Sequence, residues 1–279
     1  MEGLSIAAIG RLERLSWNTV ARWLTRAAAA ATIFNSERTR DFELFELQAD
    51  EMRTFAQGKD RPTWIYTTME VSSRLWPTSN VGSRGYQTTL SVMRDVAARA
   101  LPGAVPLIAT DGYRYYKPVV RKVFGSFCHF GQVIKQRRKD RVVKVDRIPV
   151  IGNRREMAAA LERSEDSTTL NTSFIERLNL VIRQGSAYLT RRAATHARSV
   201  QRLTEHLELF RCFYNFIRPH GALRFGKEVR TPAQQAGLVG RRLTWREILS
   251  TPLPAFLCAR GAPVVSLAAR RSIRVRIAA

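Results

Sequence analysis

Residues 105–111 read VPLIATD, a short apolar run that ends on an aspartate. A run of this length and composition is typical of a strand buried on both faces, as in parallel sheets. The preceding stretch TTLSVMRDVAARAL (88–101) has helical periodicity and stops at Pro102-Gly103. The following stretch YKPVVRKVFG (116–125) favours a short helix. This helix–strand–helix order predicts that 105–111 is a buried strand of an α/β sheet.

Further strand-like segments come before and after this strand in the sequence. Three come earlier in the chain, namely FELFELQAD (42–50), TWIYTTMEV (63–71) and SRLWPTSNV (73–81). The third contains Pro77, which weakens it or marks it as an edge strand. Residues 130–152 alternate on both sides of a basic turn and predict a β-hairpin. Helices are expected within 171–184, 198–217 and 231–238. The sequence therefore predicts an α/β domain over residues 42–248, with a mixed central sheet flanked by helices.

The first 34 residues predict a small all-α unit. Apolar residues recur at helical spacing in LSIAAIGRLERL (4–15), and Ser16 can cap a second helix, WNTVARWLTRAA (17–28). The buried face of this second helix is expected to contain Val20, Trp23 and Leu24. Two short helices joined by a tight turn form a helix-turn-helix. The turn holds Arg14 at a position where glycine is usual. Glycine is preferred there because it adopts a left-handed backbone conformation without a steric cost.

The outer face of that second helix is the candidate DNA-reading surface. In a helix-turn-helix, the second helix enters the major groove and presents polar side chains to the bases and phosphates. The alternative is a plain helical hairpin. The residues expected to contact DNA are Asn18, Thr19, Arg22 and Arg26.

The charge balance of the chain restricts its partners. Lys and Arg number 46 and Asp and Glu 23 among 279 residues, a formal net charge of +23. Such an excess favours a polyanionic partner, because phosphate contacts release counterions. The longest smooth apolar run, residues 27–34, is too short to span a membrane. Three widely separated cysteines fit a reducing cytoplasm. Residues 249–279 are rich in arginine, show little periodicity, and are expected to form a poorly ordered basic tail.

Three acidic residues are candidate ligands of a metal ion. Asp50 is expected to close the first strand and Asp111 the fourth, while Glu176 lies in the first turn of a later helix. Reactive groups gather near strand ends in open α/β sheets, and carboxylates suit Mg²⁺. Spacing alone leaves other interpretations open. Glu51 is an alternative to Asp50, and Glu176 could instead complete a capping box with Ser173 as the N-cap residue.

Basic residues near these acids are candidate phosphate contacts. Arg183 follows Glu176 by two helical turns and so lies on the same face. The run KQRRKDR (135–141) is expected at the tip of the hairpin, where five positive charges stand against one aspartate. Its residues proposed to contact DNA are Lys135, Arg137, Arg138 and Lys139. A solvated turn is the alternative for this run.

The chain resembles the DDE transposases of bacterial insertion sequences, in particular those of the insertion-sequence-one type. The resemblance extends from about residue 4 to residue 248 and is most specific in IERLNLVIRQ (175–184) and YNFIRPHGALR (214–224). Other matching pieces are QADE (48–51) and ATDGYRYY (109–116). This resemblance implies an RNase H-like catalytic core, with the three acidic positions of the family at Asp50, Asp111 and Glu176.

The resemblance implies a DNA transposase that cleaves and transfers DNA strands with two Mg²⁺ or Mn²⁺ ions. Two such ions stabilise both the attacking and the leaving oxygen of an in-line displacement at phosphorus. The expected partners are element-end and target DNA, with a homo-oligomer bridging the ends, in the cytoplasm with the nucleoid. Two alternatives remain open. One is a degenerate copy that binds DNA as a repressor, and the other is a metal-dependent nuclease without strand transfer.

Overall fold

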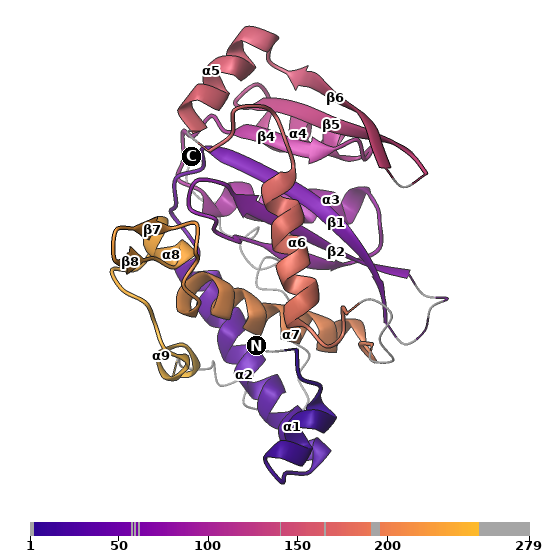
Figure 1. Ribbon diagram of the computed structural model, residues 1–279, viewed down its shortest axis with the longest axis vertical. Helices are drawn as coiled ribbons and strands as arrows, with labels where there is room; N and C mark the ends of the chain where they lie inside the picture. The colour runs from indigo at the N-terminus through magenta and orange to yellow at the C-terminus, as the bar shows by residue number, and fades with distance from the viewer. Residues whose placement is uncertain are drawn as a thin grey trace, which may run out of the picture.

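The computed structural model describes residues 3–56, 58, 60, 62–139, 141–164, 166–190 and 196–250. A six-stranded sheet lies at the centre, with helices on both faces (Figure 1). The α/β architecture with a mixed central sheet, expected from the sequence, is therefore confirmed. The predicted tail at 249–279 falls almost entirely outside the described residues.

The sheet has the strand order β3-β2-β1-β4-β5-β6. Its first three strands form an antiparallel meander, β1, β4 and β5 run parallel to one another, and β6 returns antiparallel to β5. The short strand β3 follows Pro77 and lies at the edge, as the sequence predicted. The strand bounds are β1 Glu46–Phe55, β2 Pro62–Glu70, β3 Ser79–Gly82, β4 Leu107–Asp111, β5 His129–Arg138 and β6 Arg141–Ile151.

Alternation along each strand divides the core into two layers. Leu47, Ala49 and Ile108 point to one face, where they pack against α3 (Tyr86–Arg99) and α4 (Tyr116–Phe124). On the other face, Met52 and neighbouring residues of β2 pack against α6 (Ser173–Gly185) and α7 (Val200–Cys212). Helix α5 (Arg154–Ser164), which the sequence analysis did not single out, packs on β4 and β5 at this same face.

The N-terminal helices α1 (Ile6–Leu12) and α2 (Trp17–Arg38) differ from the expected pair of short helices. The turn between them places Arg14 in the left-handed region at φ 53°, as its position suggested. Helix α2, however, continues through its alanine run to Arg38, because alanine is the strongest helix former. Its second half packs on α7 around Ala28, Ala31 and Phe34.

The expected buried face of α2 is correct only in part. Val20 is buried, but Trp23 is 54% exposed and Trp17 is 48% exposed. Burial of Trp23 was predicted from periodicity, and that prediction is wrong because α1 packs against Val20, Ala21 and Leu24 and leaves Trp23 uncovered. Both tryptophans lie in the first half of α2, where Arg22 and Arg26 are also exposed. This half of α2 and α1 together form a helical arm that extends away from the sheet (Figure 1).

Small elements complete the chain after α7. A π-helical turn at Phe213–Ile217 extends α7, and a two-residue hairpin follows, formed by β7 (Arg224–Phe225) and β8 (Glu228–Val229). Helix α8 (Pro232–Gln235) begins with Thr231 as N-cap, as expected, and α9 (Trp245–Leu249) packs near α2. Within the described residues, none of the helices combines the length and the apolarity that a membrane span requires.

Candidate metal centre

Asp50 and Asp111 lie side by side on adjacent parallel strands. The pairing of β1 with β4 ends at Ala49 opposite Thr110, so the two aspartates are the next residues of each strand. Asp111 closes β4 as predicted. Asp50 does not close β1, contrary to expectation, because β1 continues to Phe55 through its antiparallel pairing with β2. The two acids therefore meet where the pairing of β1 with β4 ends and its pairing with β2 continues.

Glu51 joins these two aspartates in one group that could hold a metal ion. Ligand oxygens of Asp50, Glu51 and Asp111 lie within 4.8 Å of one another. Burial, and then the charge of Asp111, raise the pKa of Asp50 from 3.8 to about 6 and that of Glu51 from 4.5 to about 7. Burial also raises the pKa of Asp111. These carboxylates repel one another, and a cation with a preference for oxygen ligands would relieve that repulsion.

The two neighbouring acids of β1 have different surroundings. Glu51 points to the α3 and α4 face, where its Oε1 accepts from Arg84 Nη2 at 2.6 Å and its Oε2 accepts from the Tyr116 hydroxyl at 3.0 Å. Arg84 is in turn stacked over Trp64 at 4.4 Å and Tyr113 at 4.2 Å. Asp50 points to the opposite face, toward α6. Glu51 therefore already has a cation, whereas Asp50 accepts hydrogen bonds from two neutral donors, Glu51 N and Asn179 Nδ2.

Glu176 lies on the same pocket but is bound to other partners. Its Oε1 accepts from the Lys135 ammonium group and, at 2.7 Å, from the Thr172 hydroxyl. The capping-box alternative is wrong, because Thr172 is the N-cap residue and Ser173 is the first helical residue. Among the described residues, the group within 4.8 Å contains Glu51 and not Glu176. The charge of Glu176 nonetheless contributes to raising the pKa of both aspartates.

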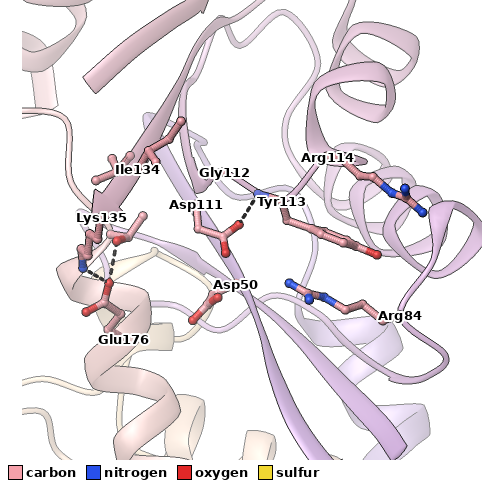
Figure 2. A pocket seen from close by; sticks show the side chains of 11 residues that line it. Asp50, Arg84, Asp111, Gly112, Tyr113, Arg114, Ile134, Lys135 and Glu176 are labelled. Atoms are coloured by element: carbon pink, nitrogen blue, oxygen red, sulfur yellow. Dashed lines mark hydrogen bonds and ion pairs between the residues drawn. The ribbon is translucent and has the colours of Figure 1, made fainter. Parts of the chain in front are cut away.

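A pocket of about 900 Å³ opens onto these acids. Figure 2 shows Asp111 at its centre, Glu176 and Lys135 on one side, and Arg84 and Arg114 on the other. The Asp111 side chain is fixed by the Tyr113 amide, which donates to its Oδ1 at 2.9 Å. Acids in the pocket with cations on two sides of Asp111 form a site suited to a metal ion together with an anionic ligand.

The predicted phosphate-binding residues do not gather at one place. Lys135 lies inside β5, paired with Val145, and reaches the pocket instead of the hairpin tip. The turn at the tip of the hairpin is shorter than expected, because β5 extends to Arg138. Arg138 and Lys139 are exposed at this tip. Arg137 lies on β5 beside the tip. Arg183 is half-buried near the end of α6 and is not among the described residues that line the pocket.

The predicted DNA-reading residues lie on the helical arm, away from the sheet (Figure 1). All four lie in the first half of α2. Asn18, Arg22 and Arg26 are exposed, and Thr19 is half-buried, with its hydroxyl 2.8 Å from that of Ser16. These positions leave the three exposed side chains accessible to a partner.

Two features of this site carry no signal in the sequence. A lone arginine before a helix, such as Arg84, indicates nothing until its aromatic neighbours are known. Gln48, which binds the amides of Phe174 and Ile175, was likewise invisible. The one-turn spacing between Glu176 and Asn179 predicts that Asn179 orients Glu176 or contacts DNA, but in the structure its side-chain amide donates to Asp50 instead. No family model matches this chain, and no curated protein matches it significantly.

Proposed function

We propose that this chain is a DNA transposase with an RNase H-like core, which cleaves DNA and transfers the freed 3′-hydroxyl to a target strand. The observation that carries this proposal is the adjacency of Asp50 and Asp111 on parallel strands, with Glu176 on the same pocket. The strand order β3-β2-β1-β4-β5 is compatible with an RNase H-like core, to which β6 adds an edge.

The donor set supports a hard divalent cation. We propose Mg²⁺ or Mn²⁺, in two sites, held by Asp50, Asp111 and Glu176. When bound, the ions would activate the attacking hydroxyl and stabilise the leaving oxygen. Glu176 must exchange Lys135 for an ion to take part. Glu51 contributes negative charge from the far face, where Arg84 balances it.

The cations of the pocket support a phosphodiester as substrate. Arg84, Arg114 and Lys135 line the pocket, and we propose that they bind phosphate oxygens of the DNA. The net charge of +23 supports binding of longer DNA through its backbone. The exposed residues of α2 are proposed to recognise element ends as part of a helix-turn-helix. We place the protein in the cytoplasm, on the nucleoid, and expect a homo-oligomer to bridge two ends.

A supercoiled-plasmid assay with Mg²⁺ and element-end DNA tests this proposal. Wild type should nick the plasmid and produce joined products. Asp111→Asn should abolish both while DNA binding persists, because the amide keeps the shape and removes the charge. Asp146→Asn, an acid on β6 outside the pocket, is the matched control and should cleave normally.

Each alternative predicts a different product pattern in that assay. Binding without nicking by the wild type would favour a repressor, and nicking without joined products would favour a nuclease. Unimpaired cleavage by Asp111→Asn would refute the assignment of the site.

A further inference from the structure

Strand β1 presents a row of polar side chains to α6. Glu46, Gln48 and Asp50 alternate with buried apolar residues, so all three point to the same face of the sheet. A polar row on a buried face is costly unless every group finds a partner. Here Gln48 and Asp50 are bonded directly to α6, whose third turn also packs in the apolar core.

Gln48 makes the first connection, at the N-terminus of α6. Its Oε1 accepts from the amides of Phe174 and Ile175, both at 3.1 Å. These amides belong to the first turn, which has no helical acceptors of its own. The Gln48 Nε2 donates to Glu46 Oε1 at 2.9 Å, which fixes the orientation of the side-chain amide. Because Thr172 provides no side-chain cap, a side chain of the sheet caps this helix instead.

Asn179 makes the second connection, one turn further along α6. Its Nδ2 donates to Asp50 Oδ2 at 2.8 Å, and its Oδ1 accepts from the Thr67 hydroxyl on β2 at 2.7 Å. Asn179 is only 5% exposed and Thr67 is fully buried. The backbone amide of Glu51 donates to the other oxygen of Asp50 at 2.8 Å. The Asp50 carboxylate is thus held by one donor on each oxygen, with lone pairs remaining for a metal ion.

The spacing of the two connections matches between strand and helix. Gln48 and Asp50 are two residues apart, about 6.6 Å along a strand. Ile175 and Asn179 are four residues apart, about 6 Å along a helix. Two matched contacts fix both the axial position and the rotation of α6 on β1. Glu176 lies between them, and a slip of one residue would turn its side chain by about 100° away from the pocket.

We propose that Gln48, Thr67 and Asn179 are positioning residues that set the separation of the Asp50 and Glu176 carboxylates. The inference deepens the proposed function, since it assigns how the metal site is assembled. None of these three side chains is among the described residues that line the pocket. They act through Asp50 and through the placement of α6.

The test measures binding of Mn²⁺ to the full chain without DNA, by the loss of the free-ion signal in electron paramagnetic resonance. Asn179→Leu keeps the volume and removes both hydrogen bonds. It should weaken Mn²⁺ binding at least about tenfold, as loss of a partner that orients a metal ligand usually does. Thr67→Val should weaken it in the same direction, and Thr67→Ser should restore it, because serine keeps the hydroxyl.

Asn215→Leu is the matched control for a purely structural effect. Asn215 is also fully buried, and it bonds both the amide and the carbonyl of Trp76, away from the pocket. Both asparagine variants should unfold at lower temperature than wild type. Only Asn179→Leu should lose Mn²⁺ affinity.

Two outcomes separate this inference from the proposed function. Wild-type Mn²⁺ affinity in folded Asn179→Leu and Thr67→Val, with binding still lost in Asp111→Asn, would overturn the positioning role and leave the metal site standing. Absence of Mn²⁺ binding in the wild type would overturn both. Should Asn179→Leu fail to fold, the comparison of Thr67→Val with Thr67→Ser decides alone.

Discussion

Strand β1 carries buried acids at two places, and they are held in opposite ways. Glu46, at the start of the strand, accepts from the hydroxyls of Ser164 and Ser167 and from the Gln48 amide. Asp50 and Glu51, in the middle of the strand, face Asp111 across a gap that a cation could fill. A carboxylate surrounded by hydroxyl donors stabilises its loop, whereas carboxylates crowded together at a pocket store repulsion that a metal ion relieves.

A third acid, Glu70, strengthens the comparison, because its surroundings resemble those of Glu46 and not those of Asp50. It lies at the end of β2 and accepts hydrogen bonds from both the amides and the hydroxyls of Ser72 and Ser73. Burial alone therefore does not mark a functional acid. The distinguishing features of Asp50 and Asp111 are mutual proximity and access to an open pocket.

The largest expected effect concerns the third ligand. Glu176→Gln should lower the rate of DNA cleavage about a thousandfold, since a bound metal contributes several kcal/mol to the transition state. Glu51→Gln should lower it less than about tenfold, because Arg84 already neutralises Glu51. Single-turnover cleavage of a labelled DNA end measures both. The reverse order of effects would assign the third ligand to Glu51.

Loss of Glu46, the acid at the start of β1, should lower the stability of the fold. Glu46→Ala should lower the free energy of unfolding by about 3 kcal/mol, because it leaves the donors of Ser164, Ser167 and Gln48 without their acceptor. Urea unfolding followed by circular dichroism gives the value. Glu46→Gln keeps an acceptor oxygen and serves as the control. A loss below about 1 kcal/mol would remove the contrast between the two places on β1.

The crowded acids should make stability depend on pH in the direction set by their raised pKa values. Because the pKa of Asp50 rises to about 6 and that of Glu51 to about 7, the folded chain binds more protons than the unfolded chain above about pH 4. The metal-free protein should therefore lose stability as pH rises from about 4 to 7, relative to Asp50→Asn.

Added Mg²⁺ should reverse this loss. It should raise the melting temperature more at about pH 8 than at about pH 5, because protonated carboxylates do not bind the ion. Thermal melts with and without about 10 mM Mg²⁺ provide the comparison. Asp111→Asn is the control and should show little effect of the ion at either pH. Equal stabilisation of wild type and Asp111→Asn would place the ion elsewhere.

The smallest expected effect concerns the ion pair of Glu176. Lys135→Gln should tighten metal binding in the absence of DNA by about twofold to fivefold, the factor expected for a partly exposed pair. Titration with Mn²⁺ measures it. Lys144→Gln, which breaks the more exposed pair with Asp146 on β6, should leave metal binding unchanged. Weaker binding by Lys135→Gln would mean that Lys135 holds Glu176 in its productive place.

The sequence predicted elements better than it predicted their ends. Most of the run VPLIATD forms β4, with Asp111 at its carboxyl end, because a short apolar run between two helical segments is typical of a strand buried on both faces of a sheet. The end of β1 was misplaced because its continuation, MRTF (52–55), is held by antiparallel pairing with residues 62–65 of β2, which the pattern of 42–50 does not reveal. The exposure of Trp23 was missed for a similar reason, since burial depends on which neighbour covers a helix.

By itself, the sequence determined the order of most helices and strands, with α5 as an exception, together with the excess of positive charge and the three acids of interest. These follow from periodicity, composition and residue type, which are properties of neighbours along the chain. Only the tertiary structure decided that Asp50 and Asp111 are adjacent, that Glu51 belongs to their group, and that Glu176 is bound to Lys135. Those facts depend on strand pairing and on how α6 lies against β1, which no local pattern specifies.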